Sequence, residues 1–172
     1  MELQLTFRHK IAHPTNNLSS AQCFLRRFAQ GFLNYFRIFG QGLDGEITAG
    51  GNIIGKTTTE NLCISGGSVT SWPAPVDNPA APGFSAGGSS GGSAAVVANN
   101  EVDVALGADQ GGSIRIPAAF CGVLGHKPTH GLFPYSGIAS LMPGLDHVGP
   151  IARSAHELAL TMDAIAGPNE DD

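Results

Sequence analysis

The first strong pattern along the chain is a stripe of aromatic residues at three- and four-residue spacing within residues 19–39. Its apolar members are Phe24, Leu25, Phe28, Phe32, Phe36 and Phe39. Ser19 or Ser20 can cap the N-terminus and arginines flank the stripe, so the pattern predicts a basic amphipathic helix. Such a helix lies either on a membrane surface or, more commonly, against a protein core.

The middle of the chain alternates short apolar runs with turn residues. Ile53 and Ile54 predict a strand. Residues 93–98 predict a helix that Ser93 caps, and the alternating apolar residues of 102–106 predict a second strand.

The remaining patterns are a proline-rich stretch and a capped helix near the end of the chain. Residues 72–92 hold four prolines and several glycines, so we expect a loop without regular structure there. Ser154 and Glu157 have the S-x-x-E spacing of a capping box ahead of an apolar stripe, which predicts a helix over residues 154–165. Helices and strands in this order favour a mixed α/β fold.

Composition divides the chain near Asp44. Residues 1–43 contain five basic residues, one acidic residue and six of the nine phenylalanines, whereas residues 44–172 contain four basic and thirteen acidic residues. We therefore predict a separate basic, Phe-rich segment over 1–43 and a core over 44–172. The acidity of the core disfavours direct contact with nucleic acid.

Cysteine and histidine usage limits the kinds of site. Three widely spaced cysteines argue against a disulfide framework and fit a reducing compartment, so we expect the cytoplasm. His126, His130 and His147 lack the paired spacing of metal ligands, and we expect no metal. No apolar run approaches the roughly 18 residues of a membrane span.

Two short motifs match well-known patterns in the wrong context. Residues 50–57 satisfy the P-loop pattern G-x-x-x-x-G-K-T, but no buried strand precedes them. Residues 87–91 satisfy G-x-S-x-G, the nucleophile elbow of α/β hydrolases, yet prolines interrupt the stretch where the preceding central strand would lie. Asp146 and His147 follow in the order of such a triad, so the elbow is kept as an alternative.

Two serine-glycine segments are far more specific than either motif. Residues 86–93 read A-G-G-S-S-G-G-S, and residues 107–122 read G-A-D-Q-G-G-S-I-R-I-P-A-A-F-C-G. Further motifs occur at 55–58, 127–132 and 145–150. Their order resembles the amidase signature family over roughly residues 46–170.

The resemblance implies a mixed central sheet covered by helices, of which this chain holds only the core. It also implies a nucleophile, a relay serine in a cis peptide, and a glycine-rich backbone that can turn its N–H groups toward one point. The implied site residues are Ser113 as nucleophile, Ser89 as relay, Gln110, Gly111 and Gly112 as oxyanion or substrate-binding groups, and Asp109 and Arg115 as supporting residues. A purely structural ion pair is the other interpretation of Asp109 and Arg115.

The reaction implied is hydrolysis of a small carboxamide to a carboxylic acid and ammonia through an acyl-enzyme, without a cofactor. Gln110 and the Ile-Pro after Arg115 are more typical of free-standing bacterial or fungal amidases than of the transamidating subunit that works on charged tRNA. Cys121 has apolar neighbours and no base nearby in sequence, so we interpret it as a packed thiol. A homo-oligomer is left open.

The lysine of the family's serine triad has no clear counterpart. Lys10 is the only lysine before Lys56, and its surroundings do not match the family motif. We interpret the chain as a truncated or N-terminally altered member, with residues 1–43 as foreign sequence. The alternative function is therefore an inactive fragment or interaction module of the amidase fold.

Overall fold

The computed structural model describes residues 5–7, 53–135, 138 and 140–167. The helix predicted over 19–39 and Lys10 lie outside the described residues. No helix within the described residues is long and apolar enough to cross a membrane.

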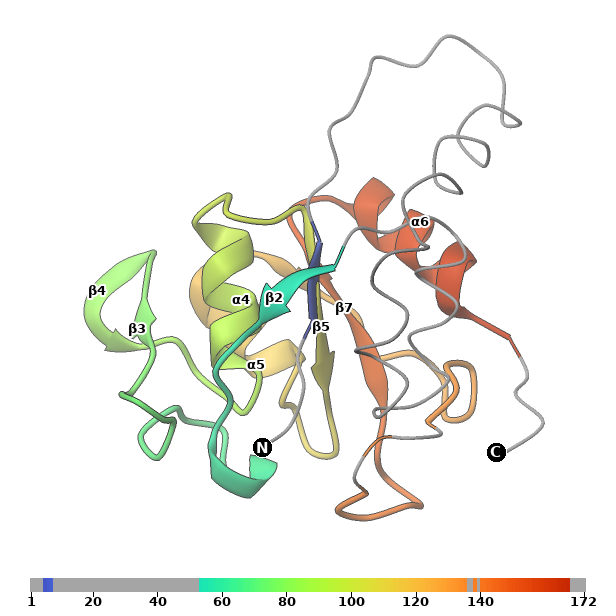
Figure 1. The fold of residues 1–172 in the computed structure, drawn as a ribbon, viewed down its shortest axis with the longest axis horizontal. Helices are drawn as coiled ribbons and strands as arrows, with labels where there is room; N and C mark the ends of the chain where they lie inside the picture. Colours follow the sequence, from blue (N-terminus) through green and yellow to red (C-terminus); the bar gives the residue numbers. More distant parts are fainter. Residues whose placement is uncertain (1–4, 8–52, 136–137, 139, 168–172) are drawn as a thin grey trace, which may run out of the picture.

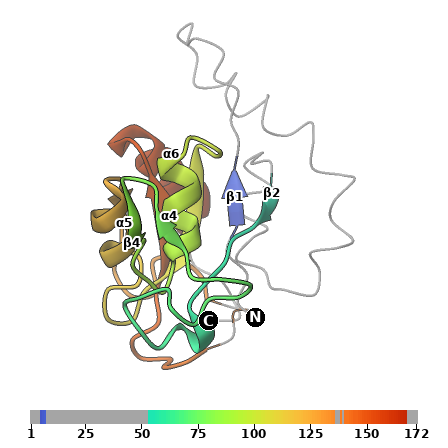
Figure 2. The ribbon, with the colours of Figure 1, turned by 90° about the vertical axis from the view of Figure 1, so that its left-hand side faces the viewer.

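An antiparallel five-stranded sheet forms the centre of the described structure (Figure 1). Its strands, in spatial order, are β2 (Ile53–Lys56), β1 (Leu5–Phe7), β5 (Val104–Ala108), β7 (Val148–Ala152) and β6 (Leu124–Gly125). Figure 2 shows β1 and β2 side by side. Part of the segment 1–43 thus pairs with the core strands, while the division of the chain near residue 44 stays a prediction.

Helices cover both faces of this sheet, because β5 is apolar and fully buried along its length. Ala105 faces α4 (Gly91–Ala98) and α5 (Arg115–Cys121), in a cluster with Ile114 and Ile151. Val104 and Leu106, at alternate positions, face α6 (Ala155–Ile165) in a second cluster. Figure 1 shows α4 and α5 on one side of β5 and β7 and α6 on the other, so the predicted helix-covered sheet is confirmed.

The strand predicted at Ile53 and Ile54 is confirmed and continues to Lys56. An extended Ile53–Lys56 segment cannot form the curled phosphate loop of the P-loop pattern. The strand predicted over 102–106 is present as β5, shifted by two residues.

The helix predicted over 93–98 is present as α4, but Ser93 does not cap it. The helix begins at Gly91, and Ser93 is buried inside it. The Ser93 hydroxyl donates to the Leu106 carbonyl at 2.8 Å and lies 2.8 Å from the Thr57 hydroxyl, so it ties α4 to the sheet. The predicted cap was wrong because this serine serves a contact between elements.

The expectation of an unstructured loop over residues 72–92 was also wrong. The segment contains a two-stranded hairpin of β3 (Asp77–Asn78) and β4 (Ala81–Ser85). Pro82 is tolerated in β4 because a two-stranded ribbon leaves one edge of each strand unpaired, whereas a central strand would need the missing N–H.

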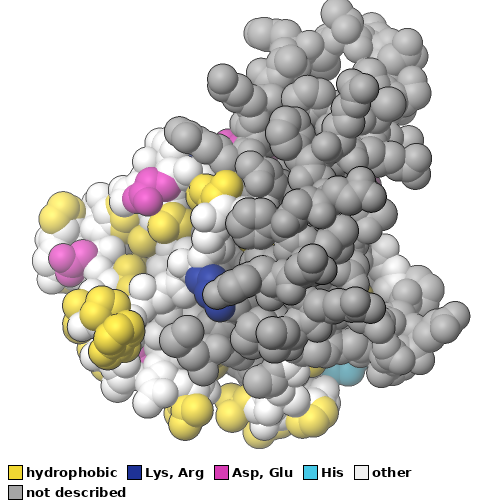
Figure 3. Space-filling view, in the orientation of Figure 1, with side chains coloured by type: hydrophobic (Ala, Val, Ile, Leu, Met, Phe, Trp, Pro, Cys, Tyr) yellow, Lys and Arg dark blue, Asp and Glu magenta, His cyan; other side chains and the backbone are white. Residues whose placement is uncertain are grey.

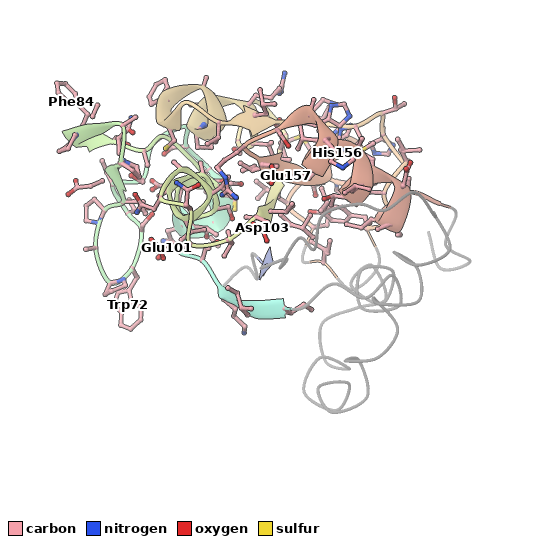
Figure 4. The ribbon with its side chains drawn as sticks, turned by 90° about the horizontal axis from the view of Figure 1, so that it is seen from above. Trp72, Phe84, Glu101, Asp103, His156 and Glu157 are labelled. Atoms are coloured by element: carbon pink, nitrogen blue, oxygen red, sulfur yellow. The ribbon has the colours of Figure 1, made fainter. Side chains whose placement is uncertain are left out.

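The capping box predicted for the last helix is confirmed. The Ser154 hydroxyl accepts from the Glu157 N–H at 3.2 Å, and the Glu157 carboxylate accepts from the Ser154 N–H at 2.9 Å. Arg153 anchors the same end of α6 by donating to the Val97 carbonyl at 2.9 Å and to Asp103 at 3.2 Å, and it lies 3.8 Å from the Glu157 carboxylate. Figure 4 labels Asp103 and Glu157 at this end of α6.

Replacing Ser154 by alanine removes both of the hydroxyl's hydrogen bonds and should lower the free energy of unfolding by about 1 kcal/mol. Urea denaturation followed by circular dichroism measures this change. Ser154→Thr is the control, since it keeps the hydroxyl that accepts from the Glu157 N–H and donates to the Glu157 carboxylate, and it should stay close to wild type. Equal stability of wild type and Ser154→Ala would show that the cap is unimportant here.

Candidate active site

The residues predicted to form the site lie in the turn that leads from β5 to α5. Asp109, immediately after β5, is fully buried, and its carboxylate accepts from the N–H groups of Gly112 at 2.8 Å and Ile114 at 3.1 Å. The segment 109–114 therefore curls around one carboxylate, and Ser113 lies within this curl.

Arg115 closes the curl from the solvent side. Its Nη2 and Nε donate to the two oxygens of Asp109 at 2.9 and 3.0 Å, in the forked geometry of a strong guanidinium–carboxylate pair. Burial raises the pKa of Asp109, but the Arg115 bond and the backbone N–H donors outweigh it and hold this pKa below its ordinary value. The predicted ion pair is present, and the same carboxylate also shapes the loop that carries Ser113.

The two glycines of this turn, Gly111 and Gly112, differ in how strictly their surroundings require glycine. Gly112 has φ of 135°, a conformation that favours glycine, and a Cβ there would lie 2.7 Å from the Ile116 side chain. Gly111 has open space around the position of a Cβ. The Gly112 N–H donates to Asp109, whereas the Gly111 and Ser113 N–H groups donate to no acceptor within the described part of the chain.

The second serine-glycine segment packs directly against this turn. The Ser90 N–H donates to the Ser113 carbonyl at 3.1 Å, which places Ser89 beside the Ser113 loop. The Gly88–Ser89 peptide is cis, as the resemblance implied. Ser89 is 0% exposed, and its hydroxyl has no hydrogen-bond partner among the described residues, which is rare for a buried polar group.

Glu60 is a site neighbour that sequence reasoning missed. Its side chain is buried at 3% exposure, and its N–H donates to the Ser89 carbonyl at 3.0 Å. The preceding threonines and the following asparagine give no local pattern that would single out this carboxylate.

Gln110 lies opposite Asp146, because the β5–β7 pairing continues through mutual backbone hydrogen bonds between Asp109 and His147. One Asp146 oxygen accepts from the Ser140 hydroxyl and from two backbone N–H groups, at 2.7–2.9 Å. Burial raises the pKa of Asp146, but the Ser140 hydroxyl and the backbone donors hold it below its ordinary value. The Gln110 Nε2 itself is buried without a hydrogen bond in the described part of the chain.

The hydrolase-elbow alternative finds no support in this geometry. Asp146 is bound to the 140–142 segment, and the His147 Nδ1 lies 2.7 Å from the Leu145 carbonyl instead of meeting Asp146. The strand before Ser89 belongs to the separate β3–β4 hairpin and not to the central sheet. Cys121 is buried, and burial raises its pKa to about 11, so its thiol is protonated near neutral pH.

Comparison with known proteins identifies the family to which this chain belongs. The Amidase family model matches residues 47–172. The chain is 52% identical over 124 residues to a glutamyl-tRNA(Gln) amidotransferase subunit of Haloarcula marismortui, covering 72% of this chain and 29% of that protein. It is 50% identical over 123 residues to an enantioselective amidase of Rhodococcus rhodochrous, covering 70% of this chain and 23% of that protein.

Solved structures share the fold. The corresponding glutamyl-tRNA(Gln) amidotransferase subunit from Thermotoga maritima matches with a TM-score of 0.75 and 38% identity, covering 77% of this chain and 29% of that one. The chain thus spans less than a third of the relatives it matches. The two kinds of relative match almost equally well, so overall identity does not separate them. The family model covers most of the sequence, and the chain belongs to the amidase signature family.

Proposed function

We propose that the chain carries the core of a serine amidase that hydrolyses a small carboxamide in the cytoplasm. The observation that carries the proposal is the hydrogen bond from the Ser90 N–H to the Ser113 carbonyl, which joins the two serine segments beside the curl around Asp109. Without that contact, two serines 24 positions apart in sequence would be separate features.

In the proposed reaction the Ser113 oxygen attacks the amide carbon while its proton passes to the Ser89 oxygen. Ser89 in turn gives its own proton to a base, the role of lysine in this family, and the relayed proton leaves with ammonia. Water then hydrolyses the acyl-enzyme and regenerates Ser113. Lys10, the candidate for the base, lies outside the described residues.

The oxyanion that forms on the amide oxygen needs donors that are not already engaged. The N–H groups of Gly111 and Ser113 fit this requirement, because the Gly112 N–H donates to Asp109. Each donor in such a hole contributes roughly 3 kcal/mol to transition-state stabilisation. Gln110 is proposed to line the substrate side of the same turn, and its presence favours a free-standing amidase over a tRNA-dependent one.

A second candidate function is an interaction module that keeps the fold without the reaction. Large apolar side chains on the 60–72 segment favour it, since Leu62 is 69% exposed, Ile64 70% and Trp72 81%. Trp72 and Phe84 point away from the described fold (Figure 4), and apolar side chains gather at the edge of the face in Figure 3.

Labelling with a fluorophosphonate probe separates the two functions. We expect wild type to be labelled, Ser113→Ala not to be labelled, and Ser89→Ala to be labelled much more slowly. Ser154→Ala is the matched control, since it removes a serine hydroxyl that follows β7 at the end paired with Val104, away from the Asp109 end of β5, and should label as wild type does. A folded wild-type protein that the probe does not label would contradict the enzyme function and favour the interaction module.

A further inference from the structure

The segment 60–70 folds back on itself around the buried carboxylate of Glu60. One carboxylate oxygen accepts from the Ser65 hydroxyl at 2.9 Å, and the other accepts from the Thr70 N–H at 3.1 Å. Ser65 and Thr70, five and ten residues further along the chain, thus both donate to the Glu60 side chain. A buried carboxylate suits this position, because it accepts on both oxygens and donates on neither.

This closed segment contacts the chain on either side of the Gly88–Ser89 peptide. On one side, the Glu60 N–H donates to the Ser89 carbonyl at 3.0 Å. On the other, the Gly67 carbonyl lies so close to Gly88 that a Cβ at residue 88 would overlap it. Gly67 is held there through Ser65, whose hydroxyl oxygen accepts from the Gly67 N–H at 3.2 Å while its proton goes to Glu60.

The contacts therefore connect the Glu60 residue to a group on each side of the Gly88–Ser89 peptide: the Gly88 Cα and the Ser89 carbonyl. We propose that Glu60 is a positioning residue for Ser89: by closing the 60–70 segment it fixes the Gly88–Ser89 peptide and so directs the Ser89 hydroxyl toward Ser113. The inference rests on the proposed function, in which Ser89 relays the proton. Glu60 itself touches no reacting atom.

The first experiment compares rates of fluorophosphonate labelling in folded protein. Glu60→Gln keeps the shape but puts an NH2 group against one of the two donors, and should slow labelling about tenfold, since small misplacements of reacting groups have effects of this size or larger. Ser65→Ala should slow it as well, and Ser65→Thr, which restores the hydroxyl on an exposed residue, should recover most of the rate. Asp103→Asn is the matched control, because it removes a carboxylate that pairs with Arg153 at the opposite end of β5.

Labelling of Glu60→Gln at the wild-type rate would overturn the inference and leave the proposed function standing. If the probe does not label the wild-type protein, that result contradicts the proposed function alone. The positioning role of Glu60 can then still be tested by hydrogen exchange. In that measurement Glu60→Gln should speed amide exchange of residue 60 and of residues 88–91, and Asp103→Asn should not. Unchanged exchange in these segments would overturn the positioning role.

Discussion

Replacing Gly88 by alanine should destabilise the folded protein by roughly 3 kcal/mol or more. The new Cβ would overlap the Gly67 carbonyl oxygen, which is backbone and cannot rotate away. Overpacking of a rigid site costs roughly 1–3 kcal/mol and occasionally more, and we expect at least the upper end of that range here. Since domains are stable by only about 5–15 kcal/mol, the melting temperature should fall by roughly 6–12 °C or more.

Thermal unfolding followed by circular dichroism, together with the soluble yield, measures this effect. Gly144→Ala is the matched control: Gly144 is exposed and has no positive φ, and a Cβ added to it would meet no atom within 4 Å, so the melting temperature of this variant should stay near wild type. Equal melting temperatures of Gly88→Ala and Gly144→Ala would contradict the close packing of the 60–70 segment against Gly88.

Local patterns predicted the elements whose determinants are local. The capping box of Ser154 and Glu157 lies within four residues, so the start of α6 could be read directly from the sequence. The alternation of β5 predicted a strand because each face meets a separate apolar cluster. The short α5, by contrast, carries Pro117 inside it and follows the site turn without a recognisable cap, and no pattern predicted it.

The candidate site was predicted from motifs, whereas its supporting contacts were not. Ser89 and Ser113 stand out because both segments are rich in glycine and occur in a known order. Glu60 could not be found in this way, because its importance comes from a contact to Ser89 across 29 positions of sequence. Ser93 was misassigned for the same physical reason: a serine that bonds to a distant strand looks in sequence like a helix cap.

The second large effect is expected at Asp109. Replacing it by asparagine should destabilise the protein by about 3 kcal/mol, because the amide nitrogen would face one of the N–H donors and Arg115 would lose its partner. Arg115→Gln is the control that removes the ion pair alone. The Arg115 side chain is 51% exposed, so water replaces much of what it loses, and we expect a cost nearer 1 kcal/mol. Equal losses of unfolding free energy in the two variants would mean that Asp109 stabilises the protein through its ion pair with Arg115 and not through the backbone N–H groups that curl around it.

The same comparison has a predictable dependence on pH. The pKa of Asp109 is lower in the folded protein than in the unfolded chain, so its ionised form favours folding at pH values above the unfolded pKa. As the pH falls toward and through the lowered folded pKa, the carboxylate is protonated and this contribution is lost. The difference in unfolding free energy between wild type and Asp109→Asn should therefore be largest near pH 7 and should shrink in acid. Asp146, whose pKa is also lowered, titrates in both proteins and cancels in the difference. A difference that stayed constant from about pH 7 to about pH 2 would show that the Asp109 charge does not hold the loop that carries Ser113.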